Sequence, residues 1–562
     1  MKQHPTFIIL LILLSTTFLS AQEYTKRPSV AEPNPEGLED YLQRLLNEAY
    51  IPGISLAIVR EGKIVYNTAL GLKSMDTGEA LDQETIFAAA SLSKPLFAYA
   101  VLKLVERGEF DLDKPLYEYM EYPDISSDDR YKQITARMVL SHSGGFPNWR
   151  NGDLKILFTP GERFQYSGEG FVYLMKVIEH ISGKKINDWM QEMAFEPLGM
   201  NHSSYVWKDA YEANFAMPHN EMKKTFPKFK PQEGNTAHSL QTTAADFAQF
   251  INALIQYKGL KQETIEQMLS PQVKVSDEQS GTVDWGIGIG LQKVDNRKAF
   301  WHWGDNGTFR CFVIGFPLEQ TGLVYFTNSS NGLGIAPTLV ARVFGTQLPS
   351  MEWQNYDPYN SPTRKILIAA LDGNFDPIIQ QYLDRGGQHQ DTLLINERSM
   401  NRLGYNLMAF KLMNEAKKVL RMNMKAYPKS SNVYDSYAEA CLRNGDQAEA
   451  AQFYAKAAEM NPENKIAATI VERLNRQNHQ GNATFRMEGY PMARHVSLAG
   501  SFNNWNDLSH PLIWENGAWT CTLQLEPGDY EYKFVVDGVW IPDPSNKNVN
   551  PEDNLNSMIK IK

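Results

Sequence analysis

The chain has 562 residues, which predicts three or four domains at about 150 residues each. It contains 55 Lys and Arg and 65 Asp and Glu, so its net charge is −10; 43% of its residues are hydrophobic and 21% are charged. This composition is that of ordinary globular proteins and excludes a mainly disordered or collagen-like chain. The acidic balance also argues against a nucleic-acid partner, because proteins that bind phosphate backbones usually carry a basic face.

The N-terminal residues 1–21 predict a signal peptide. Lys2 and His4 precede an apolar run over residues 7–14, and small residues lead to Ala21, after which we expect cleavage. The run is too short for a bilayer span of about 20 residues, and no later segment is apolar enough, so the chain is not expected to span a membrane. We therefore expect export through the Sec pathway, to the periplasm or as a secreted protein. An uncleaved N-terminal anchor is the alternative.

The cysteines predict neither a disulfide framework nor a metal site. Cys311, Cys441 and Cys521 lie far apart, each in a different predicted domain. No paired Cys and His spacing matches a zinc-binding motif. No metal and no cofactor is therefore expected.

Residues 22–350 combine helical periodicity with short apolar strands. Near the start, residues 54–59 and 64–66 are typical of a hairpin, and near the end residues 311–316 and 322–327 form another pair of expected strands. Helical segments lie between them. Helices enclosed by strands from both ends predict an α/β (α+β) domain whose sheet joins its N- and C-terminal portions.

A linker is expected at residues 351–362, and residues 363–476 are then helical. The tetratricopeptide pattern places a small residue, Ala and Pro at positions 8, 20 and 32 of about 34 residues. Two successive segments match it, with Gly404, Ala416 and Pro428 in the first and Ala438, Ala450 and Pro462 in the second. An earlier helical pair is expected at residues 365–371 and 376–384. Such hairpins act either as a rigid spacer or as a groove for a protein partner.

Residues 477–484 form a second predicted linker, and residues 485–562 have strong strand character. Residues 530–537 alternate between two faces, with apolar residues on one: Tyr530, Tyr532, Phe534 and Val536. Glycine-containing turns bound this strand. The pattern predicts a small immunoglobulin-like β-sandwich at the C-terminus.

The strongest chemical motif is Ser91-Leu92-Ser93-Lys94, which is followed by Pro95. Proline is tolerated only near a helix start, so Ser91 is expected at the N-terminus of a helix with Lys94 on the same face. A serine hydroxyl needs an adjacent base to act as a nucleophile, and the helix N-terminus favours developing negative charge. Ser93 is expected to have a structural role at the helix start.

Three further motifs follow Ser91 in the chain: Leu140-Ser141-His142-Ser143-Gly144-Gly145, Phe164-Gln165-Tyr166-Ser167-Gly168 and Trp301-His302-Trp303-Gly304. Their order and spacing resemble the serine β-lactamase and penicillin-binding-protein superfamily, most closely the class C β-lactamase-like esterases and D-alanyl-D-alanine peptidases. The resemblance covers residues 35–346 and implies an antiparallel sheet with helices. His142 is interpreted as a residue that orders a turn through hydrogen bonds.

The resemblance implies catalytic roles for Ser91, Lys94 and Tyr166. Ser91 would be the acylated nucleophile, and Lys94 would exchange its proton. Tyr166 would act with Lys94 as general base and later activate water. The expected reaction has two steps, through an acyl-enzyme.

The motif Trp301-His302-Trp303-Gly304 would line the cleft from the edge of a strand. His302 and Gly304 match the family's Lys-Thr-Gly element, with His in place of Lys. The backbone N–H groups of Ser91 and Asp305 would form the oxyanion hole. One departure concerns the Tyr-x-Asn motif, because Gly168 stands where the family has Asn. The side-chain amide that normally holds a peptide or β-lactam is therefore missing, and replacing Gly168 with Asn is expected to improve penicillin acylation.

These residues favour an exported serine hydrolase of small esters, including acyl groups linked to carbohydrates. The alternative in the same class is a D-alanyl-D-alanine carboxypeptidase or β-lactamase, with a D-Ala-peptide or β-lactam substrate. A non-catalytic protein that binds envelope glycans or proteins is the alternative in a different class. Retention of Ser91, Lys94 and Tyr166 together argues against it.

The C-terminal region carries a second resemblance. Residues 499–505 and 532–540 are similar to the glycogen-binding family of carbohydrate-binding modules (family 48). In that family two tryptophans stack on glucose rings while a lysine and an asparagine bind hydroxyls. The matching positions are Trp505, Trp540, Lys533 and Asn556. The resemblance implies an α-glucan-like polysaccharide as ligand; the alternative is that both tryptophans are core residues.

Overall fold

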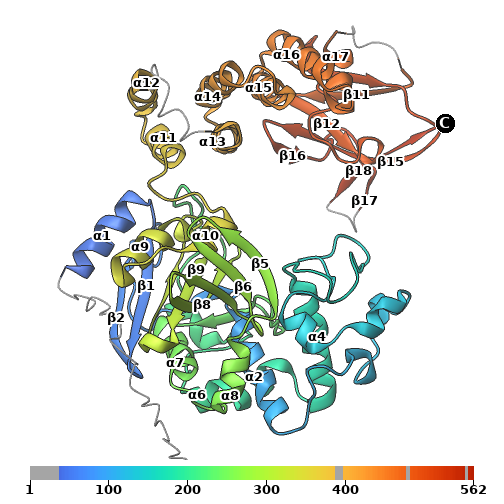
Figure 1. The fold of residues 1–562 in the computed structure, drawn as a ribbon. Helices are drawn as coiled ribbons and strands as arrows, with labels where there is room; N and C mark the ends of the chain where they lie inside the picture. Colours follow the sequence, from blue (N-terminus) through green and yellow to red (C-terminus); the bar gives the residue numbers. More distant parts are fainter. Residues whose placement is uncertain (1–36, 386–395, 476–480, 551–554) are drawn as a thin grey trace, which may run out of the picture. The chain divides into compact units, whose positions relative to one another are not determined.

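The computed structural model describes residues 37–385, 396–475, 481–550 and 555–562. The chain divides after Pro358 into two compact units (Figure 1). The predicted signal peptide, residues 1–21, lies outside the described residues. Within the described ranges, no helix is both long enough and apolar enough to cross a membrane.

A large antiparallel sheet forms the centre of the first unit. Among its described residues, eight strands pair in the order β2-β1-β10-β9-β8-β7-β6-β5. Their bounds are β1 Gly53–Arg60, β2 Lys63–Gly71, β5 Val273–Glu278, β6 Gly281–Trp285, β7 Gly290–Val294, β8 Arg297–Asp305, β9 Arg310–Phe316 and β10 Thr321–Thr327. Strand β1 pairs with β10 from Ile54 opposite Thr327 to Arg60 opposite Thr321. The sheet therefore joins the two ends of the domain, as the sequence predicts.

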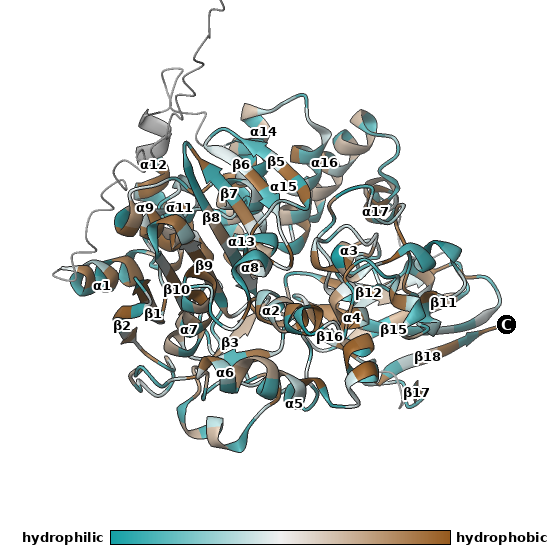
Figure 2. Ribbon diagram, turned by 60° about the horizontal axis from the view of Figure 1, so that its bottom comes forward, coloured by the Kyte–Doolittle hydropathy of each residue, from teal (hydrophilic) through white to brown (hydrophobic). Residues whose placement is uncertain are grey.

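The central strands are buried on both faces. Every residue of β10 is buried, and Figure 2 shows hydrophobic residues concentrated on β8, β9 and β10. Near-continuous apolar strands are typical of sheets covered on both sides. Helix α7 packs against β1 and β10, while α1 and α9 lie on the other side of the sheet (Figure 1).

A helical region adjoins the sheet and contains the short pair β3 (Phe87–Ala90) and β4 (Leu240–Thr242). The helices of the unit are α1 Leu38–Glu48, α2 Ser93–Glu106, α3 Ala136–Leu140, α4 Gly168–Ser182, α5 Ile186–Met190, α6 Glu196–Leu198, α7 Ala244–Ile255, α8 Gln262–Met268, α9 Ala336–Phe344 and α10 Pro349–Gln354. Helix α2 is buried from Ser93 to Leu104. A helix that is apolar on all sides belongs in a core, so α2 provides a rigid support for the motif at its start.

The predicted linker at residues 351–362 is partly a helix of the first unit. Helix α10 packs against β5, β6 and β7. The Trp353 ring lies 6.1 Å from both Trp301 and Trp303, measured between centroids. The first unit therefore extends to Pro358, beyond the predicted boundary at residue 350.

The second unit begins with successive antiparallel helices. They are α11 Pro362–Leu371, α12 Phe375–Arg385, α13 Glu397–Ala409, α14 Met413–Ala426, α15 Ser431–Arg443, α16 Gln447–Met460 and α17 Lys465–Asn475. The small residues of the predicted repeats lie where helices approach: Gly404 abuts Leu420, and Ala438 and Ala450 are fully buried. A larger side chain at Gly404 would separate α13 from α14.

Two small sheets complete the second unit, in the orders β11-β14-β13 and β12-β15-β18-β17, with β16 beside β15. Their bounds are β11 Ala483–Glu488, β12 Val496–Gly500, β13 Ile513–Glu515, β14 Ala518–Leu523, β15 Gly528–Val536, β16 Val539–Ile541, β17 Val549–Asn550 and β18 Asn556–Ile561. Tyr532, Phe534 and Val536 join Phe485 and Cys521 in one shared core. The alternation predicted for residues 530–537 thus packs one sheet against the other.

Candidate active site

Ser91 lies in a sharp turn between β3 and α2. Ala90, the last residue of β3, has a φ of 45°, a left-handed conformation that is uncommon for a residue with a Cβ. The Ser93 hydroxyl donates to the Ala90 carbonyl at 2.6 Å and accepts from the Leu240 N–H at 3.0 Å. Ser93 therefore fixes the turn to β4, which is the structural role expected of it. The turn presents Ser91 just before the start of α2.

Lys94 lies one helical turn from Ser91 and points toward it. Its Nζ donates to Ser91 Oγ at 3.0 Å and to the Ala237 carbonyl at 2.8 Å. The side chain is fully buried, and burial lowers the pKa of Lys94 to about 7. A lysine with this pKa is partly neutral near pH 7, so it can accept the Ser91 proton.

Tyr166 packs beneath this lysine. Lys94 Nζ lies 4.8 Å from the centre of the Tyr166 ring. The Tyr166 hydroxyl is buried and interacts with the Ser91 side chain, which lowers the tyrosine pKa by less than burial raises it. Burial raises the pKa of Tyr166, so the phenol stays protonated near neutral pH. In this geometry Lys94 is the available base, and Tyr166 can pass a proton to a bound group.

His142 holds the loop that carries Tyr166. Its Nδ1 accepts from the Ser167 N–H at 3.0 Å, and its backbone carbonyl accepts from the Gln165 N–H at 2.7 Å. The imidazole centroid lies 4.3 Å from that of Tyr166. These contacts agree with the interpretation of His142 as a residue that orders a turn.

His302 lies on β8, fully buried and close to the same tyrosine. Its Nδ1–H donates to the Trp303 carbonyl at 2.7 Å, which leaves Nε2 as an acceptor without a partner among the residues described. Burial, together with the charge of Lys94, lowers the pKa of His302 to about 3. The imidazole is therefore neutral at ordinary pH. It offers a substrate carboxylate no positive charge.

Gly304 allows β8 to run against β3. A Cβ at this position would collide with the Ala89 carbonyl oxygen and with Cys311 Sγ. The absence of a side chain brings the following residue, Asp305, to the end of the strand that leads into Ser91. The Asp305 carboxylate accepts from Tyr356 at 2.5 Å and pairs with Arg310 at 3.1 Å.

The space of the missing Asn side chain is already filled. A Cβ on Gly168 would lie 2.6 Å from Trp149 Cη2 and 2.9 Å from the Asn148 carbonyl oxygen. The expectation that Gly168→Asn alone improves penicillin acylation therefore does not fit this geometry, because Asn would have to displace Trp149. Nothing in the sequence motif indicated Trp149, since its loop is distant from residue 168 in the chain.

Three aromatic side chains lie near Lys94. Trp149 packs edge-on against His238 with centroids 5.5 Å apart, and Phe229 lies 6.0 Å from His238. His238 follows Ala237, whose carbonyl holds Lys94. Trp149 and Phe229 are 46% and 53% exposed, so this apolar surface is accessible to a ligand. Sequence reasoning missed all three side chains because they come from irregular loops.

The structure places both tryptophans and Lys533 of the predicted carbohydrate site on one side of the sandwich, and Asn556 on the neighbouring strand β18. The Trp505 and Trp540 rings have centroids 6.2 Å apart, and Trp540 pairs across the strands with Val535, on the same face of β15 as Lys533. Asn556 Nδ2 donates at 2.8 Å to Glu531 Oε2, and Asn556 is only 5% exposed, so its amide is engaged by the protein. Trp540 is 44% exposed and so is not a core residue.

The described residues contain no group of His, Cys, Asp or Glu that could hold a metal ion. The three cysteines are buried free thiols.

Comparison with known proteins identifies the fold of this site. A family model described as "Beta-lactamase" matches residues 38–344, more than half of the chain. The chain belongs to the β-lactamase family. A second model, described as "Glycogen recognition site of AMP-activated protein kinase", matches residues 484–562 beyond the β-lactamase domain.

Individual relatives of the β-lactamase domain are distant. Esterase EstB of Burkholderia gladioli is 27% identical over 215 residues, which cover 33% of this chain and 54% of EstB. Protein flp of Staphylococcus aureus is 22% identical over 318 residues, covering 52% and 62% of the two chains. Penicillin-binding protein 4* of Bacillus subtilis is 23% identical over 383 residues, covering 60% and 80%. The chain thus spans only about half of EstB and less than two thirds of flp.

Among solved structures, the octameric penicillin-binding protein homologue from Pyrococcus abyssi superimposes with a TM-score of 0.50. It is 24% identical and covers 60% of this chain and 81% of its own. The likeness concerns the fold.

Proposed function

We propose that this protein is a serine acyl hydrolase that cleaves small esters. The observation that carries the proposal is the 3.0 Å hydrogen bond between Lys94 Nζ and Ser91 Oγ, made by a buried lysine whose pKa is about 7. A nucleophile in contact with a base that is partly neutral at working pH is the arrangement that covalent catalysis requires. The name of EstB, an esterase, supports the same class.

In the proposed reaction, Ser91 Oγ attacks the ester carbonyl carbon as Lys94 takes its proton. The tetrahedral oxyanion lies at the start of α2, where the backbone N–H groups of Ser91 and Asp305 would stabilise it. Its collapse breaks the ester bond, and the alkoxide leaves with a proton delivered by Lys94 through Tyr166. Water, deprotonated by the same pair, then attacks the acyl-enzyme, releases the carboxylic acid and restores Ser91.

Three features favour esters over peptides and β-lactams. Trp149 occupies the space in which a side-chain amide would hold an amide substrate. The neutral His302 supplies no charge for the carboxylate that D-Ala peptides and penicillins carry. The wall of Trp149, Phe229 and His238 offers apolar surface for an acyl group. Acyl groups attached to carbohydrates belong to the proposed range, because the chain also carries the sandwich.

A second proposed activity is binding of an α-glucan-like polysaccharide by the sandwich. It is supported by the match to the glycogen recognition model and by the exposed Trp540, which lies beside Trp505 and on the same face of β15 as Lys533. Tryptophan faces pack against sugar C–H groups, and the polar side chains supply hydrogen bonds. We place both activities outside the cytoplasm, periplasmic or secreted, on the basis of the N-terminal residues 1–21.

Intact-protein mass spectrometry tests the enzyme proposal. The wild-type chain and Ser91→Ala are exposed briefly to a fluorophosphonate, p-nitrophenyl butyrate or benzylpenicillin. We expect fluorophosphonate labelling and nitrophenol release that both require Ser91, without a lasting penicillin adduct. A long-lived penicillin adduct would instead support a D-alanyl-D-alanine carboxypeptidase or β-lactamase. A folded protein that no reagent modifies would contradict the enzyme proposal and favour a binding protein.

A further inference from the structure

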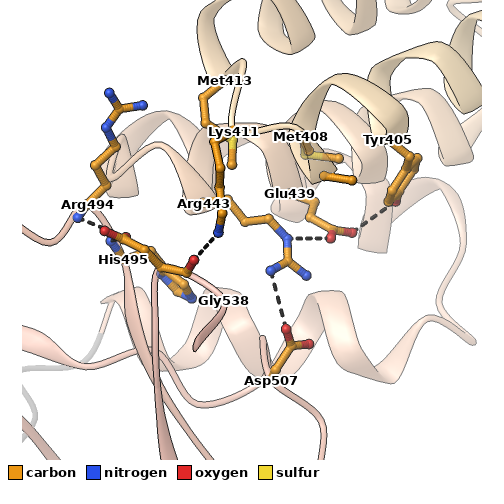
Figure 3. A pocket seen from close by; sticks show the side chains of 12 residues that line it. Tyr405, Met408, Lys411, Met413, Glu439, Arg443, Arg494, His495, Asp507 and Gly538 are labelled. Atoms are coloured by element: carbon orange, nitrogen blue, oxygen red, sulfur yellow. Dashed lines mark hydrogen bonds and ion pairs between the residues drawn. The ribbon is translucent and has the colours of Figure 1, made fainter. Parts of the chain in front are cut away.

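A cavity of about 530 Å³ lies inside the second unit, between its helices and the sandwich (Figure 3). From the helices it is lined by Tyr405 and Met408 of α13, by Lys411 in the turn before α14, and by Arg443 of α15. From the sandwich it is lined by the start of β12, the loop at residue 507 and the β15–β16 turn. Its volume falls within the range of about 300–1,000 Å³ that is typical of small-molecule sites.

The charges around the cavity balance. Its described lining contains three cations and three carboxylates, Lys411, Arg443, Arg494, Glu439, Asp507 and Asp537. Arg443 joins Glu439 at 2.8 Å and Asp507 at 3.3 Å, and Lys411 donates to the Asp537 carbonyl (Figure 3). An anionic ligand would be repelled by the carboxylates, and a cationic ligand by the lysine and the arginines. The balance favours a neutral ligand that both donates and accepts hydrogen bonds, as hydroxyl groups do.

His495 forms part of one wall of the cavity. The residue is 3% exposed, and its imidazole interacts with the Asp507 backbone. Burial lowers the pKa of His495 to about 4, so the ring is neutral and adds no charge to the lining. This wall therefore keeps the balance of charge that suits a neutral ligand.

The cavity also has an apolar side and continues a surface already described. Tyr405 and Met408 contribute an aromatic ring and a thioether, against which the C–H face of a sugar can pack. Asp507 lies two residues after Trp505, and Gly538 lies two residues before Trp540. Two residues span at most about 7 Å, so the same two loops carry the tryptophans and border the cavity.

We propose that this cavity is a carbohydrate subsite, built jointly by the helices and the sandwich, that takes a glucosyl residue of a chain lying on Trp505 and Trp540. The inference rests on the proposed α-glucan binding and gives the helical region a part in it. Hydroxyls of the bound residue interact with the Arg443 network, while Tyr405 packs on its ring face.

Isothermal titration calorimetry on the full-length mature protein with maltotriose and maltoheptaose tests this subsite. Ala409→Phe fills the cavity from the exposed end of α13 without removing a charge, and Tyr405→Ala removes the ring expected to pack on the sugar. We expect each variant to lower the affinity for maltoheptaose about tenfold and to leave the affinity for maltotriose within twofold. Ala468→Phe on α17, also exposed but outside the cavity lining, is the matched control and should bind like wild type.

The outcomes separate this inference from the proposal on which it rests. Trp505→Ala should weaken both oligosaccharides, which would support the tryptophan surface. Wild-type affinity for maltoheptaose in both Ala409→Phe and Tyr405→Ala would overturn the subsite while glycan binding stands. No binding of either oligosaccharide by the wild-type protein would overturn the proposed glycan binding itself. Thermal melting of each variant confirms that a lost affinity is not lost folding.

Discussion

Each unit of the molecule holds a lysine beside a tyrosine, and the two pairs have different surroundings: Lys94 is fully buried, whereas Lys417 is partly exposed. In the helical region, Lys417 and Tyr437 both donate to Glu449, at 2.9 and 2.7 Å. In the active site, Lys94 and Tyr166 have no such carboxylate, and Lys94 forms no ion pair with a described residue. The same residue types therefore stabilise one region and supply reactivity in the other.

The consequence is visible in the lysine pKa values. Burial alone would lower the pKa of Lys417, but hydrogen bonds to Asp446 and Glu449 raise it. Burial without such a partner lowers the pKa of Lys94 to about 7. Lys94 can thus act as a base at neutral pH because no carboxylate pairs with it.

Removing each lysine should have the largest and most contrasting effect. Lys94→Ala is expected to lower kcat/KM for p-nitrophenyl butyrate by about 10²–10⁴, because the Ser91 proton loses its acceptor. Lys417→Ala should leave the rate unchanged. Steady-state kinetics on both purified variants measures this. Equal loss of activity in the two would mean that Lys94 acts through folding alone.

The tyrosines provide a second matched pair. Tyr166→Phe is expected to lower the rate by about 10²-fold or more, since the leaving alkoxide would lose its proton relay. Tyr437→Phe should not affect hydrolysis. Burst kinetics would show which step Tyr166 serves. Near-wild-type turnover by Tyr166→Phe would show that Tyr166 does not relay the proton to the leaving group.

The pH profile should report the unpaired lysine. Catalysis needs neutral Lys94, so kcat/KM should rise tenfold per pH unit below pH 7 and level off above about pH 7. His302, with a pKa of about 3, should contribute no step in this range. A profile that is flat from pH 5 to 9 would be incompatible with Lys94 as the base.

Giving Lys94 a carboxylate should make it resemble Lys417. His238 follows the carbonyl that holds Lys94, and the lysine charge is close enough to help lower the pKa of His238. His238→Asp is therefore expected to raise the apparent pKa of the rate profile by about 1 unit, because a nearby negative charge favours the protonated amine. His238→Asn is the uncharged control. An identical shift in both variants would exclude a charge effect.

The smallest effect concerns stability, with opposite signs at the two sites. The folded-state pKa of Lys94 is below the ordinary 10.5, so wild type gains stability from this group as pH rises from 7 to 10.5. The difference in Tm, Lys94→Met minus wild type, should therefore be larger at pH 7 than at pH 10. Lys417→Met should lose about 1 kcal/mol at pH 7, a loss that fades above pH 10.5. Melting curves across this range compare them.

Much of the fold could be predicted from the sequence because strand pairs and repeats are local signals. The strands at 54–59, 64–66, 311–316 and 322–327 lie within β1, β2, β9 and β10 of the structure. The helical pair at 365–371 and 376–384 likewise lies within α11 and α12. Helix α10 was missed because its few residues resemble a linker and are stabilised only by packing on the sheet.

The active site was predictable only as far as its motifs extend. Ser91, Lys94, Tyr166 and His302 are close in the structure as the motif order implies. Trp149 was not predictable, because its contact with residue 168 depends on how a loop folds back. Gly168 shows that the side-chain amide is absent, but the motif does not predict which side chain occupies the space beside residue 168.

The contact between Tyr356 and Asp305 bears on how the hydrolase can be separated from the rest of the chain. The family match ends at residue 344, yet α10 and Tyr356 lie beyond it and touch the strand that ends in Asp305. A protein shortened to residue 344 would lose the hydrogen bond from Tyr356 to Asp305, together with the ring of Trp353. Anyone who isolates the catalytic part for crystallisation or assay should therefore retain the chain through Pro358.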